Sequence, residues 1–192
     1  MARDDRLLVV AARTAAFWSF AYGCYRLYYA AGGLVGLAGT PVSMAQFRLI
    51  NAVAAIALFV TAAVPLVCLG RWRRHRAIGL LLILSWLIAV GCIMHALVDI
   101  VQRIASLAGV LVIDYPLWIA PNRRALDLQD LLFNEPWFLV EGLLWAVMAW
   151  AGALHTSPRR WWWIGSAVAA IVVLTAAGIM SAFGVIGRAI VF

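Results

Sequence analysis

The sequence predicts an all-α fold: a polytopic membrane helical bundle of about five transmembrane helices, forming a single domain over residues 1–192. Of the 192 residues, 66% are hydrophobic and only 12% are charged, and the mean hydropathy is +0.98. A soluble domain of this size could not cover so much apolar surface, so the expected solvent is a bilayer. Five segments also provide the roughly 20 apolar residues that a helix needs to cross about 30 Å of hydrocarbon.

The five predicted helices cover approximately residues 7–31, 48–69, 77–101, 136–154 and 162–183. The first holds Trp18 and Arg26 and is longer than the apolar core of a signal peptide, so we expect a retained helix. Gly32 and Gly33 are expected to end it, because glycine adopts the left-handed conformation of a helix C-terminus at little cost. Pro65 lies inside the second helix, where neighbouring helices can satisfy the carbonyl that its ring frees.

Residues 104–135 are predicted to form an extracytoplasmic connection between the third and fourth helices. The apolar run at 104–113 is too short to span, so we expect an interfacial or re-entrant piece there. An amphipathic turn is expected at 126–132. Asn134 suits the N-cap of the fourth helix, and Pro136 suits its first turn.

The arginines predict that the N-terminus lies in the cytoplasm and the C-terminus outside, because basic flanks are retained on the cytoplasmic side. One alternating set consists of the N-terminus and the turns at 71–76 and 156–161; it holds Arg3, Arg6, Arg71, Arg73, Arg74, Arg76, Arg159 and Arg160. The opposite set holds Arg48, Arg103, Arg123, Arg124 and Arg188 and is diluted by acidic residues. The two basic turns are therefore expected at lipid headgroups of the cell membrane, with Trp161, Trp162 and Trp163 in the interfacial aromatic belt.

Ionisable side chains inside the predicted helices point to a polar cluster, because such residues are costly in lipid and face protein or water. In the third helix, spacings of three and four place Cys92, His95, Asp99, Arg103 and Ser106 on one face. With the N-terminus inside, Arg26, His95, Asp99 and Glu141 all fall in the outer halves of their helices. The expected intramembrane cluster is Arg26, Tyr22, Tyr29, His95, Asp99, Arg103 and Glu141.

Two interpretations of this cluster stay open. Arg26 could pair with Asp99 or Glu141 to neutralise charge and fix helix register. Alternatively, a small pocket opens to the extracytoplasmic side, roofed by 104–135, and binds a polar headgroup or another small molecule. A histidine beside Asp99 could also relay a proton.

The absence of several known motifs weighs against some classes of function. The cysteines form no CxxC or Cys/His pair, and HExxH and GxSxG are absent, so no metal, cofactor or catalytic residue is predicted. The glycines at 32–39 lack the Lys-Ser/Thr partner of a phosphate loop. Gly178 and Ala182 form a small-xxx-small pair that permits close helix packing, inside the bundle or between copies.

The runs Phe17-Trp18-Ser19-Phe20-Ala21-Tyr22-Gly23, Tyr29-Ala30-Ala31-Gly32-Gly33-Leu34-Val35-Gly36-Leu37 and Asn134-Glu135-Pro136-Trp137-Phe138-Leu139-Val140-Glu141-Gly142-Leu143-Leu144 carry a family resemblance. They resemble an uncharacterised family of small multi-pass integral membrane proteins from actinobacteria, over about the first 155 residues. All 15 basic residues are arginine, which is typical of a GC-rich bacterial genome. The resemblance implies a membrane protein with four helices, so the fifth departs from it, and it implies no catalytic residue.

Three functions follow from the sequence. The first is a non-enzymatic membrane component, or a bundle that binds a small molecule or lipid. The second is an oligomeric transporter or channel subunit, and the third is a membrane-embedded enzyme that uses His95 and Asp99 as acid and base. The expected partners are the lipid bilayer and either a second copy of the chain or a larger membrane complex, with no nucleic acid.

Overall fold

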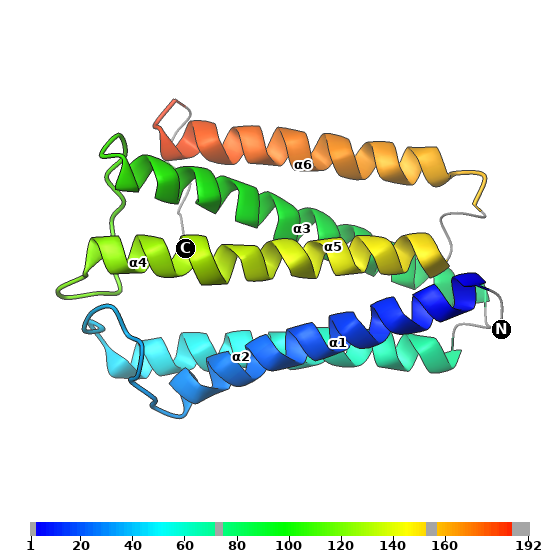
Figure 1. Cartoon of the computed structure of the whole chain (residues 1–192), viewed down its shortest axis with the longest axis horizontal. Coiled ribbons are helices and arrows are strands. Elements are labelled where there is room, and N and C mark those ends of the chain that lie inside the picture. Colours follow the sequence, from blue (N-terminus) through cyan, green and yellow to red (C-terminus); the bar gives the residue numbers. More distant parts are fainter. Residues whose placement is uncertain (1–2, 72–74, 153–156, 186–192) are drawn as a thin grey trace.

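The computed structural model describes residues 3–71, 75–152 and 157–185, and every regular element within them is a helix (Figure 1). The elements are α1 (Arg3–Ala30), α2 (Met44–Arg71), α3 (His75–Leu107), α4 (Arg123–Gln129), the π-helix η1 (Asp130–Asn134), α5 (Glu135–Gly152) and α6 (Arg160–Ala182). Five helical rods are long and apolar enough to cross a membrane: α1, α2, α3, α6, and α4–η1–α5 as one. The predicted fold class and the number of spans are therefore confirmed.

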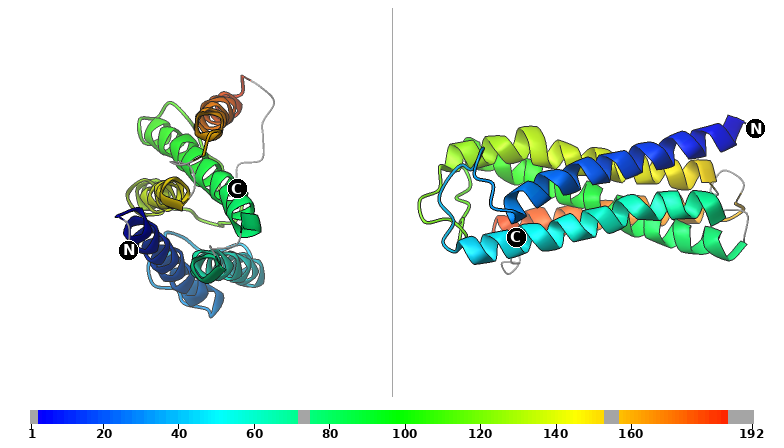
Figure 2. Two further views of the ribbon diagram at one scale, coloured as in Figure 1. Left: turned by 90° about the vertical axis from the view of Figure 1, so that its right-hand side faces the viewer. Right: turned by 90° about the horizontal axis from the view of Figure 1, so that it is seen from below.

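The five rods form an open row in the order α2, α1, α5, α3, α6. Among the described residues, α1 packs along α2 and α5, α5 packs along α3, and α6 contacts only α3. The end-on view shows α6 at the edge of this row (Figure 2). The arrangement leaves apolar side chains such as Val172 and Val173 outside the protein core, as expected for helices that face lipid.

Helices α1 and α3 both end at a glycine with a positive φ, at one end of the bundle that we call the loop end. Gly32 has φ of 99° and Gly109 has φ of 73°. In each case the residue after the glycine donates its backbone N–H to a carbonyl five residues back, as in a Schellman motif. The expected stop at Gly32 is confirmed. Residues 104–113 do not form a separate re-entrant segment, because α3 continues through Leu107 and Gly109 ends it. Their position at the membrane interface stays a prediction.

Two connections, 31–43 and 108–122, cover the loop end by pairing with each other. The Val42 amide donates to the Leu117 carbonyl (2.9 Å), and the Ile119 amide donates to the Thr40 carbonyl (2.8 Å). These bonds satisfy backbone groups that a loop would otherwise leave exposed. The second connection is thereby fixed above the ends of α1 and α3.

The fourth span begins earlier than the sequence analysis predicts, because α4, η1 and α5 form one continuous rod from Arg123 to Gly152. Asn122, not Asn134, is the N-cap, and its side chain accepts from the Ala125 amide. Pro136 explains the π-helix: it has no N–H, and its ring would clash with the carbonyl four residues back in a regular α-helix. The connection is therefore 108–122 rather than 104–135.

The predicted basic regions lie together at the end opposite the loop end. Helix α1 begins there, α2 and α3 meet there, and α6 begins there at Arg160 (Figure 1). Arg159 is exposed and so are Trp161 and Trp162, as expected for an interface. Arg73, Arg74 and Arg188, and the side chains of Arg3, Arg71 and Arg76, lie outside the described residues. The orientation of the bundle in the membrane stays a prediction.

Helix α3 is approached closely on two sides through glycines. A Cβ atom at Gly178 of α6 would lie 2.7 Å from Cγ2 of Val98, and one at Gly142 of α5 would lie 2.6 Å from Cγ1 of Ile93. Such distances show direct helix-to-helix contact at both glycines. The expected role of Gly178 in close packing is confirmed, and its partner lies inside the bundle.

Candidate functional site

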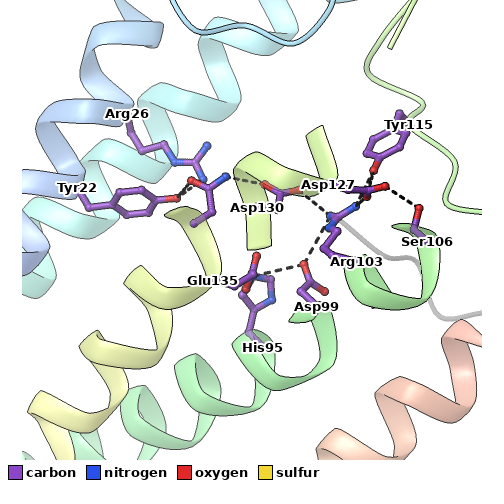
Figure 3. A network of polar contacts seen from close by, with 11 residues as sticks. Tyr22, Arg26, His95, Asp99, Arg103, Ser106, Tyr115, Asp127, Asp130 and Glu135 are labelled. Carbon is purple, nitrogen blue, oxygen red and sulfur yellow. Dashed lines mark hydrogen bonds and ion pairs between the residues drawn. The ribbon is translucent and has the colours of Figure 1, made fainter. Parts of the chain in front are cut away.

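The polar stripe predicted on α3 faces the interior of the bundle near the loop end. His95, Asp99, Arg103 and Ser106 all lie toward α4, η1 and the first turn of α5 (Figure 3). Asp99 is 5% exposed and Arg103 is 7% exposed. Asp99 and Arg103 are thus buried against other polar groups, whereas the His95 side chain stays 40% exposed.

Arg103 is the centre of the network. Its Nη2 lies 3.0 Å from Oδ2 of Asp130 and 3.8 Å from Oδ2 of Asp99, and its Nη1 lies 3.5 Å from Oδ1 of Asp127. The guanidinium carbon also lies 5.6 Å from the centre of the Tyr115 ring. Burying one cation is costly, and three nearby carboxylates compensate that cost.

Asp127 ties the connection at 108–122 to α3. Its carboxylate accepts from Oγ of Ser106 (2.7 Å) and from the Tyr115 hydroxyl (2.5 Å). Burial, with the hydrogen bond to Asp127, raises the pKa of Tyr115 above its ordinary range, so the hydroxyl keeps its proton and continues to donate. The roof of the loop end is therefore bonded to the transmembrane helix below it.

His95, Asp99 and Glu135 form a second group on the lower side of Arg103. Nε2 of His95 lies 4.0 Å from Oδ2 of Asp99 and 3.8 Å from Oε2 of Glu135. The imidazole also packs edge-to-face on Phe138, with ring centres 4.8 Å apart. The three residues bring one nitrogen and two carboxylate oxygens within 4.8 Å of one another, which is a metal-ligating type of donor set.

Helix α1 reaches this network through hydrogen bonds rather than through an ion pair. Arg26 donates to the Tyr22 hydroxyl (2.7 Å) and to Asn51 (3.3 Å), and Tyr22 donates to Oδ1 of Asn134 (3.0 Å). Asn134 then donates to Asp130 (2.6 Å). The predicted pairing of Arg26 with Asp99 is therefore wrong, since Arg103 takes that place.

Two of the predicted residues lie apart from the network. Glu141 accepts from Oγ of Ser19 (2.6 Å) and from the Trp145 indole (2.7 Å), so its expected ion pair with Arg26 is also wrong. Tyr29 donates to the Val35 carbonyl and so holds the connection at 31–43. The structure thus brings together five of the seven predicted residues: Arg26, Tyr22, His95, Asp99 and Arg103.

The sequence analysis missed the partners that α4 and η1 supply. Asp127, Asp130 and Asn134 follow one another at spacings of three and four, which places them on one helical face. That spacing, in a stretch without proline or glycine, was a signal that 123–134 is helical and has a polar inner side. No such spacing in the sequence identified Tyr115 or Glu135 as part of the network.

A hollow of about 440 Å³ lies beside the network, between α3, the connection at 110–116 and the end of α6. Gln102 and Ser181 line it from the two helices, and Asp114 lines it from the connection. As the sequence analysis expects for a pocket, the connection between the third and fourth spans covers this hollow. The hollow lies beside the predicted cluster and not within it, because none of the seven predicted cluster residues lines it.

Comparison with known proteins gives no further constraint. No protein family, no curated protein and no solved structure matches the chain. The resemblance to small actinobacterial membrane proteins stays a prediction. Five helices that are long and apolar enough to cross a membrane indicate a multi-pass membrane protein.

Proposed function

We propose that the chain is a non-enzymatic multi-pass protein of the cell membrane that binds a lipid or a small amphipathic molecule in the hollow at its loop end. The observation that carries this proposal is the hollow itself. Its volume of about 440 Å³ falls in the range of about 300–1,000 Å³ that is typical of ligand sites.

The wall of the hollow suits an amphipathic ligand. Val110, Val112 and Phe183 supply apolar surface, whereas Gln102 and Ser181 supply polar groups from two helices. Ligand sites combine mostly apolar walls with a few fixed polar groups in this way. Gln102 is only 3% exposed, so its position is fixed by the packing around it.

The polar network serves as the support of this site. Arg103 follows the lining residue Gln102, and Tyr115 lies between the lining residues Asp114 and Pro116. The Arg103–Tyr115–Asp127 contacts therefore bond α3 to the roof of the hollow. A site built on such a fixed frame needs little ordering when its ligand binds.

The alternative functions have less support. His95 and Asp99 do not line the hollow, so an acid–base pair would not meet a ligand there. A channel within one chain would need a polar path to the opposite end. In the described residues that end holds an apolar core made of Leu8, Ala11, Ala12, Leu81, Ala89, Trp145, Met148 and Ala151. With the predicted orientation, the hollow lies on the extracytoplasmic side.

The test is the identity and amount of lipid that copurifies with the full chain in a mild detergent, measured by native mass spectrometry. Ala182→Trp should fill the hollow, because Ala182 lines it, and the bound lipid should be lost. Ala176→Trp is the matched control on an exposed position of the same helix, and it should keep the lipid. Wild-type protein without bound lipid, or equal lipid in both variants, would refute the proposal.

A further inference from the structure

The group formed by His95, Asp99 and Glu135 has the dimensions of a metal site. Its donor atoms are separated by 4.0 Å and 3.8 Å for the two pairs that include the imidazole, and all three lie within 4.8 Å. Ligands at about 2.1 Å from an ion lie about 3.4 Å apart in a tetrahedron and about 4.2 Å apart across an octahedron. Only small side-chain rotations are needed to place an ion between these atoms.

Among the described residues, one of the donor atoms has no hydrogen-bond partner. Glu135 is 2% exposed, and its Oε2, the oxygen that faces His95, makes no hydrogen bond to any residue that the structure describes. At 3.8 Å the imidazole is too far away to donate to it. A buried carboxylate oxygen without a partner is costly, and an ion at the centre of the group would satisfy it.

The charges around the group also favour a cation. Four carboxylates converge on this region of the bundle: Asp99, Asp127, Asp130 and Glu135. Arg103 is within ion-pair distance of the three aspartates but not of Glu135. Arg26 is held by Tyr22 and Asn51 instead. Among the described residues, Glu135 therefore has no basic side chain within ion-pair distance other than His95.

The surroundings orient the ligands and leave a way in. Asp99 is held from the other side by Arg103, and Phe138 fixes the plane of the His95 ring. Contacts of this kind orient ligands in metal sites. The His95 side chain is 40% exposed, so the group is open on that side and an ion bound there can keep a further ligand in an open position.

We propose that His95, Asp99 and Glu135 bind one first-row divalent metal ion of the Zn²⁺ or Mn²⁺ type. An imidazole suits zinc and iron, whereas carboxylates suit manganese, magnesium and calcium, so the mixed set favours Zn²⁺ or Mn²⁺ over Mg²⁺ or Ca²⁺. The site is separate from the hollow and does not depend on the proposed lipid binding.

The test is metal binding by the full chain in detergent after treatment with a chelator. Wild-type protein should bind one Zn²⁺ or Mn²⁺ per chain in calorimetry. Co²⁺ bound in place of these ions should give an absorption spectrum that indicates an imidazole ligand. Glu135→Gln should weaken binding at least about 100-fold, since even outer contacts of metal sites cost about 10–100-fold. Glu141→Gln is the matched control, because it removes a buried carboxylate from the same helix outside the group, and it should bind like wild type.

Several outcomes would overturn the proposal. These are no binding of Zn²⁺ or Mn²⁺ by wild type, unchanged binding after Glu135→Gln, or an equal loss after Glu141→Gln. Thermal unfolding of the chelated proteins identifies a variant that fails to fold. In that case His95→Asn provides the same test, and Zn²⁺ bound with wild-type affinity would refute the site. Lipid content is measured in the same samples, so a failed metal site and a failed lipid site are told apart.

Discussion

Replacing Tyr115 by phenylalanine removes one hydroxyl from the network and leaves the aromatic ring in place. The hydroxyl donates to Asp127 at 2.5 Å and accepts from Arg103 at 3.0 Å. Hydrogen bonds to charged groups contribute about 1.5–3 kcal/mol each, and water can reach part of this half-buried residue. We expect Tyr115→Phe to lower the free energy of unfolding by about 2 kcal/mol.

Unfolding in mixed micelles with increasing sodium dodecyl sulfate, followed by tryptophan fluorescence, measures this loss. Tyr28→Phe is the control, because Tyr28 is exposed and its hydroxyl only accepts from the Val35 amide, so its loss should stay below about 1 kcal/mol. Ser106→Ala removes a second donor to Asp127, and the two changes should couple by about 0.5 kcal/mol or more. A change below about 0.5 kcal/mol for Tyr115→Phe would refute the reasoning.

The same hydroxyl predicts a pH dependence. The pKa of Tyr115 is raised above its ordinary value of 10.0, mainly by burial and by the hydrogen bond to Asp127. The folded state therefore keeps a proton that the unfolded state loses, so the stabilisation is complete below pH 10.0 and is lost as the pH rises above it. The stability difference between wild type and Tyr115→Phe should shrink in that range. A constant difference would contradict the assignment.

Three further changes test the packing of α6 on α3, the buried carboxyl of Glu141 and the orientation of the bundle in the membrane. Gly178→Leu should separate α6 from α3 and expose α6 to protease, whereas Gly165→Leu on the same helix, where a Cβ meets nothing within 4 Å, should not. Glu141→Leu should lower the thermal unfolding midpoint, because it leaves the buried Trp145 indole N–H without its acceptor at about 1–3 kcal/mol, whereas Ser19 can still donate to the Ala15 carbonyl; Glu141→Gln should lower it less. In a cysteine-free background, Val35→Cys should react with an impermeant thiol reagent on intact cells and Pro158→Cys only after lysis; the reverse pattern would invert the topology.

The number of spans and the end of α1 were predictable because their signals are local. A run of apolar residues is enough to define a membrane-crossing helix, and Gly32 is enough to end one. The polar face of α3 was predictable for the same reason, since it depends only on the spacing of His95, Asp99 and Arg103 within one helix. All of these features need information from a single segment.

The partners across helices were not predictable, because they depend on how separate segments pack. The sequence analysis considered Arg26 as the partner of Asp99, whereas Arg103 of the same helix takes that place. Asp127 and Asp130 reach Arg103 only through the packing of α4 and η1 on α3. The π-helix before Pro136 changes the face that this rod presents, and hydropathy carries no trace of that change. Because residues 104–113 are mostly apolar, the sequence analysis treated them as a segment of their own and did not identify Gly109 as the end of α3.

The order of the helices in the row has a consequence for biosynthesis. Helix α3 contacts α2 only slightly, and its main neighbours, α5 and α6, are synthesised after it. When α3 reaches the translocon, Asp99 and Arg103 can pair within their own helix, but Asp127 follows Arg103 by 24 residues and is still inside the ribosome. The charged residues of α3 therefore reach the membrane before their partners on α4. This order favours joint release of α3 with the rod from Arg123 to Gly152 into the lipid, and α6 then docks on α3.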